Sequence, residues 1–168
     1  MYEKDPPKIH IIGIGNLTRL DDGIAIHILD ELRKETFPDN IKISDLGTGG
    51  IDIALALDGW SFGIIIDAVK IENLQPGELI EFDINNEVLP EVAGLSSSHG
   101  FDALSALKLA FSVSDFNLPK KLVIVGVQVE QIDGFGTNIS PKVQAAIPKV
   151  IAKIHDLIKD FTLNYTDG

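Results

Sequence analysis

Short apolar runs without a polar face are the feature that most restricts the fold of this chain. Ile9–Ile14, Ile64–Ile66 and Leu122–Val129 are rich in isoleucine, valine and leucine. Runs of this kind are typical of strands that are buried on both faces, as in the centre of a parallel sheet. Ile41–Leu46 predicts another strand, and Gly77–Phe82 alternates weakly, which indicates an edge strand that can run antiparallel.

Segments with helical spacing lie between these strands. Apolar residues recur at helical intervals after Asp22, over Ile51–Leu57 and over Phe101–Phe111. A last long helix is predicted to start with Ser140 as its N-cap and to be perturbed by Pro148. Strands that alternate with helices predict an α/β fold, a three-layer α/β/α sandwich with a mostly parallel twisted sheet of about five strands. The 168 residues suit one domain over residues 1–168.

Composition excludes several kinds of partner and chemistry. The net charge of −11 argues against nucleic acid or an anionic membrane surface, because phosphate binding needs clustered cations. Residues 71–107 contain acids but neither lysine nor arginine, which indicates a solvated face or a docking surface for a basic partner. The absence of cysteine removes disulfides, thiolate metal sites and thiol nucleophiles. No signal peptide or membrane-spanning run is evident, so we expect a soluble, cytoplasmic protein.

Two aspartates follow strands that are predicted to lie in the same sheet. Asp22 comes shortly after the first strand, and Asp67 ends the third. In an open α/β sheet, ligands bind at the carboxyl ends of the strands where the strand order reverses, so the two carboxylates can meet in one crevice. A structural explanation is also available for Asp21 and Asp22, which can cap a helix and interact favourably with its dipole.

A histidine in a loop supplies a third candidate. His99 lies in a serine- and glycine-rich segment before a predicted helix, whereas His10, His27 and His155 are most simply structural or surface residues. Two carboxylates and one imidazole form a three-ligand set with open positions. Such a set suits a divalent ion such as zinc, nickel or iron.

Other chemistries fit the residues less well. Gly13-Ile14-Gly15 resembles the start of a dinucleotide loop, but Thr18 replaces the third glycine and the acids that follow disfavour pyrophosphate. Ser96–Ser98 adjoin a histidine, yet the Gly-x-Ser-x-Gly elbow is absent.

The string from Asp45 to Gly49 does not match the Asp-Thr-Gly loop of paired-aspartate proteases. We expect Asp45 and the glycines of residues 47–50 to shape the wall of the crevice instead, since glycine allows close backbone approach.

Several motifs, taken in order, resemble the nickel–iron hydrogenase maturation proteases over nearly the whole chain. They are Gly13-Ile14-Gly15-Asn16, Asp21-Asp22-Gly23, Asp67-Ala68, Pro76-Gly77 and Ser98-His99-Gly100 before Asp102-Ala103-Leu104. The resemblance implies an endopeptidase, of the type classed as aspartic, that removes a C-terminal extension from a hydrogenase large-subunit precursor after nickel insertion. It implies that Asp22, Asp67 and His99 are both the catalytic and the metal-contacting residues, and that the precursor carries the nickel.

The chain departs from the family pattern in two places. Asp22 stands where some members have glutamate, and Gly100-Phe101 replaces longer versions of the loop. Whether the nickel or a carboxylate-held water supplies the nucleophile stays open. Two other hypotheses are a non-catalytic metal-binding maturation chaperone that uses the same ligands, and a nucleotide-binding module.

Overall fold

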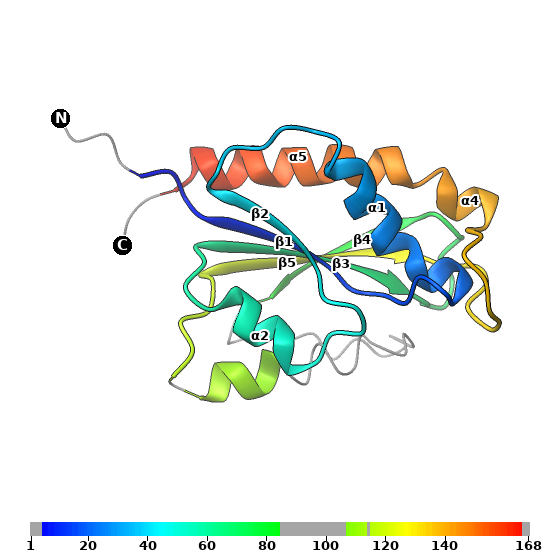
Figure 1. The fold of residues 1–168 in the computed structure, drawn as a ribbon, viewed down its shortest axis with the longest axis horizontal. Helices are drawn as coiled ribbons and strands as arrows, with labels where there is room; N and C mark the ends of the chain where they lie inside the picture. Colours follow the sequence, from blue (N-terminus) through cyan, green and yellow to red (C-terminus); the bar gives the residue numbers. More distant parts are fainter. Residues whose placement is uncertain (1–4, 85–106, 114, 166–168) are drawn as a thin grey trace.

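A computed structural model describes residues 5–84, 107–113 and 115–165 of the chain (Figure 1). His99 therefore lies outside the described residues. The strands are β1 (Ile9–Gly13), β2 (Ile41–Asp45), β3 (Phe62–Val69), β4 (Leu79–Ile84) and β5 (Lys121–Gln128). The helices are the 3-10 helix η1 (Leu20–Gly23), α1 (Ile24–Leu32), α2 (Ile51–Leu57), α4 (Pro141–Gln144) and α5 (Ile147–Leu163), and residues 107–112 are also helical.

The described strands form a five-stranded sheet in the order β2-β1-β3-β5-β4. Strands β2, β1, β3 and β5 run parallel to their neighbours, and β4 pairs antiparallel with β5 at one edge. The predicted α/β fold with a mostly parallel sheet is confirmed, including the edge position of β4. The turn before β4 contains Gly77, which takes a positive φ of 87° as the Pro76-Gly77 signal predicts.

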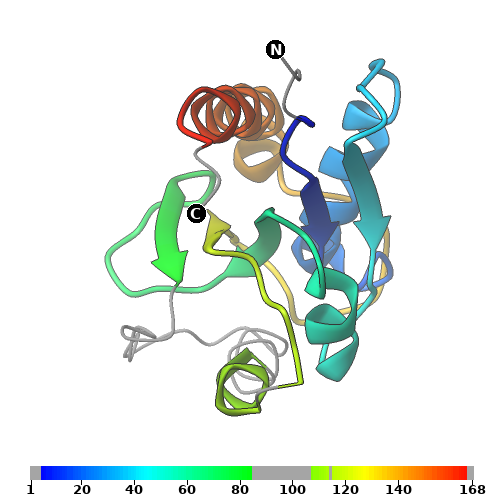
Figure 2. The ribbon, with the colours of Figure 1, turned by 90° about the vertical axis from the view of Figure 1, so that its left-hand side faces the viewer.

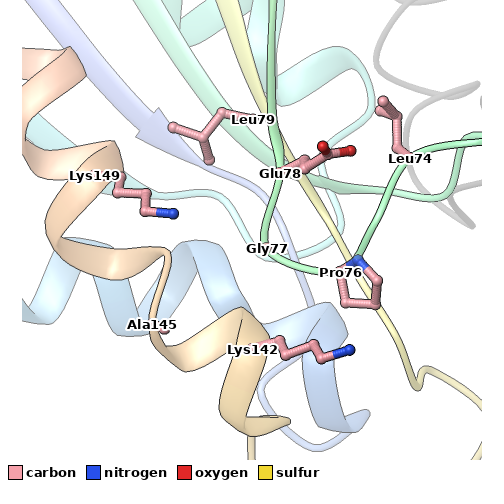
Figure 3. Close-up of a pocket in the computed structure, with 8 residues that line it drawn as sticks. All are labelled: Leu74, Pro76, Gly77, Glu78, Leu79, Lys142, Ala145 and Lys149. Carbon is pink, nitrogen blue, oxygen red and sulfur yellow. The ribbon is translucent and has the colours of Figure 1, made fainter.

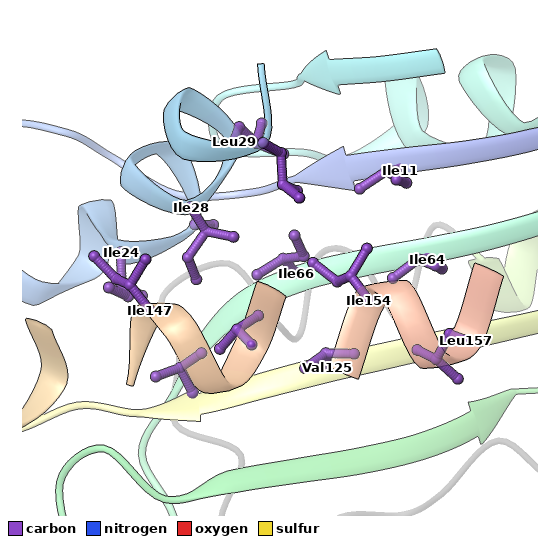
Figure 4. Packing of buried hydrophobic residues seen from close by; sticks show 14 of the residues in the cluster. Ile11, Ile24, Ile28, Leu29, Ile64, Ile66, Val125, Ile147, Ile154 and Leu157 are labelled. Carbon is purple, nitrogen blue, oxygen red and sulfur yellow. The ribbon is translucent and has the colours of Figure 1, made fainter. Parts of the chain in front are cut away.

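Helices cover both faces of the sheet (Figures 1 and 2). Side chains alternate across a strand, so Ile64 and Ile66 of β3 pack in the cluster with α1 and α5, while Ile65 packs in the cluster with α2 (Figure 4). Burying an isoleucine contributes roughly 1.5–3 kcal/mol, which explains why central strands of this composition need helices on both sides.

The structure bears on three local predictions. The predicted last helix is interrupted next to Pro148, as its predicted perturbation indicates: α4 ends at Gln144 and α5 begins at Ile147, with Pro148 in the first turn of α5, where a missing N–H costs nothing. Asp67 does not end its strand but lies inside β3, two residues before Val69. Of the helix predicted over residues 101–111, residues 107–111 are helical and residues 101–106 lie outside the described residues. Within the described residues no helix is long and apolar enough to cross a membrane.

Candidate functional site

The candidate site lies where the strand order of the sheet reverses. From β1 the chain moves outward to β2 and then crosses to β3 on the other side of β1, so the carboxyl ends of β1 and β3 flank the switch point. The segment after β1 begins with a hydrogen bond from Ile14 N to Ile66 O (2.9 Å) and leads to η1, which contacts β3. Asp22 of η1 and Asp67 of β3 are thereby brought together at the predicted edge of the sheet.

Asp67 is a buried carboxylic acid that hydrogen bonds satisfy only in part among the described residues. Its side chain is 4% exposed, and its Oδ1 has no hydrogen-bond partner among the described residues. Burial raises the pKa of Asp67 well above its usual value; the charge of Asp22 raises it further, and a hydrogen bond with the Ala68 backbone opposes the shift. A side chain this costly to bury is more typical of a functional site than of a core.

Asp22 is held by the glycine-containing turn that follows β1. The residue is 2% exposed, and its Oδ2 accepts a hydrogen bond from Asn16 N at 3.2 Å. A Cβ on Gly15 would overlap the backbone oxygen of Asp22, so only glycine lets the two backbones lie this close. The Gly-Ile-Gly-Asn motif thus positions an acid.

We expect Gly15→Ala to destabilise the fold by about 1–3 kcal/mol, because the added methyl group must displace the backbone of Asp22. Urea unfolding followed by circular dichroism measures this loss. Gly59→Ala is the matched control, because Gly59 has a φ of 78° and a Cβ there would meet no neighbouring atom. The Gly59→Ala substitution should therefore destabilise the fold only through backbone strain, by about 1–2 kcal/mol. A Gly15→Ala protein as stable as the wild type would contradict the close approach.

Asp21 has a structural role that the capping interpretation does not describe. The N-cap of α1 is Gly23, without a side-chain cap hydrogen bond. Asp21 Oδ2 instead accepts hydrogen bonds from Glu130 N (3.0 Å), Gln131 N (2.8 Å) and Ser140 Oγ (2.8 Å), and its Oδ1 accepts one from Ser140 N. Asp21 therefore fixes both ends of the loop between β5 and α4. Ser140 is the N-cap residue of α4 as predicted, but its hydroxyl is committed to Asp21.

The glycine-rich turn after β2 lies beside the segment that carries Asp22. Leu46 N donates to Gly13 O at 3.1 Å, and Gly15 N donates to Gly47 O at 2.7 Å. Asp45 Oδ1 accepts from Gly47 N at 2.8 Å, which stabilises the turn from within. These hydrogen bonds place residues 47–50 next to the switch point, where we expected a crevice wall.

The other histidines have surroundings of their own. His10 is buried, with Nδ1 2.8 Å from Ala56 O and Nε2 2.8 Å from Ser44 Oγ, and burial lowers its pKa. His155 pairs with Glu35 at 2.7 Å on the surface. His27 Nε2 is buried without a partner in the described part of the chain.

Two of the three predicted site residues can therefore be placed, and they lie together. Within residues 5–84, 107–113 and 115–165, no three histidine or acidic side chains gather as a metal site would require. A three-ligand site thus needs a residue from outside these ranges, where His99 lies.

A separate pocket of about 570 Å³ lies between the turn before β4 and helices α4 and α5 (Figure 3). Its lining residues are Leu74, Pro76, Gly77, Glu78, Leu79, Lys142, Ala145 and Lys149. Neither Asp22 nor Asp67 lines this pocket, so the pocket is distinct from the candidate site.

The raised pKa of Asp67 gives the stability of the metal-free protein a defined pH dependence. The folded state holds the Asp67 proton more tightly than the unfolded state, so the contribution of Asp67 to stability is greatest below a pH of about 4 and is lost as the pH rises through the folded pKa. Asp67→Asn has no such proton to lose. We expect the stability of Asp67→Asn relative to wild type to increase as the pH rises above about 4. Urea unfolding of both proteins checks this, with Asp156→Asn on the surface of α5 as the control; parallel curves would contradict it.

The sequence of the chain matches that of known proteins over most of its length. The HycI family model, described as hydrogenase maturation protease, matches residues 26–157, a range that contains Asp67 and His99 and begins just after Asp22. Hydrogenase 2 maturation protease of Escherichia coli (strain K12) is 28% identical over 160 residues, covering 89% of this chain and 92% of that protein. Hydrogenase expression/formation protein HoxM of Azotobacter vinelandii is 33% identical over 146 residues, covering 84% and 67%.

Solved structures share the fold. The hydrogenase maturating endopeptidase HybD from E. coli superposes with a TM-score of 0.77 at 25% identity, covering 91% of this chain and 93% of that one. HybD from Thermococcus kodakarensis has the same fold, with a TM-score of 0.75 at 24% identity and coverage of 90% and 99%. The chain belongs to the hydrogenase maturation protease family, which confirms the resemblance seen in the sequence motifs.

Proposed function

We propose that this protein is an endopeptidase that removes the C-terminal extension of a nickel–iron hydrogenase large-subunit precursor after nickel has been inserted. In this proposal the nickel is part of the substrate, and Asp22, Asp67 and His99 contact it. The contact positions the scissile peptide bond beside the paired carboxylates. Relatives named as hydrogenase maturation proteases support the class of reaction.

One observation carries the proposal: Asp67, whose buried Oδ1 has no hydrogen-bond partner among the described residues, lies close enough to Asp22 at the switch point of the sheet for the two charges to interact. A buried oxygen without a hydrogen-bond partner costs roughly 1–3 kcal/mol, and a ligand that contacts it recovers part of that cost. Carboxylate oxygens and an imidazole are acceptable ligands for nickel, so the residue types fit the proposed contact.

The proximity of Asp22 suits Asp67 for responding to a cation. Without one, burial and the neighbouring charge favour the protonated form of Asp67. Asp67 gives up this proton when a divalent ion approaches, because the positive charge stabilises the carboxylate. The same pair of acids can hold and deprotonate a water molecule near the peptide bond, as general acid–base catalysis requires. Nickel recognition and water activation would thus use the same two carboxyl groups, those of Asp22 and Asp67.

The test is to incubate the purified protein with nickel-loaded precursor and to record the intact mass of the precursor over time. We expect a single cut that releases a short C-terminal peptide. A stable complex with unchanged precursor mass would overturn the protease and support the metal-binding chaperone. Neither cleavage nor complex formation would overturn both.

A further inference from the structure

A nearly fully exposed phenylalanine lies on the loop that Asp21 fixes beside the candidate site. Phe135 is 93% exposed, in the loop between β5 and α4. A single exposed apolar residue on a surface is ordinary and needs no explanation. The way in which the chain holds this residue is less ordinary, because the loop is rigidly attached to the segment that carries Asp22.

Backbone pairing joins the Phe135 loop to residues 18–20. Gly136 N donates to Thr18 O at 2.8 Å, and Leu20 N donates to Gly136 O at 2.9 Å. Asp21 accepts the hydrogen bonds at both ends of the same loop. The two segments lie side by side at the end of the molecule where α4 begins (Figure 1). Asp22 lies in η1, directly after the paired residues 18–20. Phe135 is therefore held at a fixed place relative to Asp22.

The segment that pairs with this loop includes one residue in an uncommon backbone conformation. Leu20 has a positive φ of 52°, which is uncommon for a residue with a branched side chain. Its side chain lies directly under the turn, since a Cβ on Gly134 or Gly136 would approach Leu20 to within 3.2 Å and 3.1 Å. Leu20 thus occupies the inner side of the turn, while Phe135 stays in solvent.

We propose that Phe135 is a substrate-positioning residue that inserts into an apolar patch of the folded large-subunit precursor beside its C-terminal extension. This inference rests on the proposed function. A rigid aromatic side chain loses little conformational freedom on binding, and aromatic anchors dominate the energetics of many interfaces. Leu17, which is 40% exposed in the segment between β1 and η1, offers a second apolar contact. Docking through Phe135 would bring the extension to the paired carboxylates.

The experiment compares wild type with Phe135→Ala, Phe135→Trp and Leu163→Ala in cleavage of nickel-loaded precursor. Leu163 is the matched control, because it is 72% exposed at the C-terminal end of α5. We expect Phe135→Ala to raise KM about 10-fold with kcat changed less than about twofold. Phe135→Trp should restore most of the affinity, and Leu163→Ala should match wild type. Unfolding midpoints of all variants should agree, since the Phe135 side chain packs against little.

Binding of the precursor, measured by biolayer interferometry in an Asp67→Asn background, separates the two proposals. If the wild-type protein does not cut the precursor, the proposed function is overturned. The ratio of the precursor affinities of the Phe135 and Phe135→Ala proteins still tests the role of Phe135 as an anchor for the precursor. Cleavage by wild type with equal KM and equal affinity for Phe135→Ala and Leu163→Ala would overturn the anchor alone. A fall in kcat at unchanged KM would overturn it as well.

Discussion

Asp67→Asn is expected to lower the rate of precursor cleavage by about 100-fold or more, in the range associated with loss of a general acid–base group. Asparagine has nearly the shape of the protonated acid, so the fold around β3 is retained. It can neither release a proton nor present a charged oxygen to a cation, and the buried Oδ1 at the switch point loses both proposed roles. Intact-mass kinetics with nickel-loaded precursor measure the effect.

Two comparisons make the Asp67 result specific. Asp156→Asn removes an exposed acid from α5 and should cut at the wild-type rate. Asp67→Asn should also be at least as stable as wild type at neutral pH, because it removes a carboxyl group whose ionisation opposes folding. An Asp67→Asn protein that cuts as fast as wild type would remove Asp67 from the site.

Asp21→Ala is expected to destabilise the fold by about 3–5 kcal/mol, because one substitution removes the acceptor of four hydrogen bonds that contribute roughly 1 kcal/mol each. The substitution leaves the amides of Glu130, Gln131 and Ser140 without their acceptor. We expect the largest local effect in residues 130–140, whose ends Asp21 holds. Urea unfolding measures the free energy, and hydrogen exchange of these amides measures the local loosening.

Asp58→Ala is the control for this loss. Asp58 Oδ1 accepts one hydrogen bond, from Asn117 N at 2.7 Å, in an exposed setting. Removing it should cost about 0.5–1.5 kcal/mol. Equal losses for Asp21→Ala and Asp58→Ala, or unchanged exchange in residues 130–140, would show that Asp21 does not hold the loop.

The architecture of the sheet could be predicted because it depends on local patterns. Runs such as Ile64–Ile66 have no polar face, so they must be buried on both sides, and the helical segments between them supply the cover. The edge position of β4 followed from its weaker alternation. The proximity of Asp22 and Asp67 also followed from general rules, since both come from the carboxyl ends of parallel strands flanking the switch point.

Features that depend on distant partners could not be predicted from sequence. The hydrogen bonds of Asp21 reach residues 109 to 119 positions away, and no local pattern signals them. A local view therefore favours helix capping for Asp21. The depth of Asp67 inside β3 was missed because pairing with β5 extends the strand beyond the three isoleucines, to Val69. Phe135 carries no signal in sequence, because its exposure becomes evident only once the loop is folded.

The most direct test of the central claim, that this site acts on a nickel-containing substrate, is the dependence of cleavage on nickel. The precursor is prepared with and without nickel, and each form is incubated with the same amount of wild-type protein while its intact mass is followed. We expect loss of the C-terminal peptide from the nickel-loaded form and an unchanged mass for the metal-free form. Equal rates of cleavage for the two forms would contradict the account.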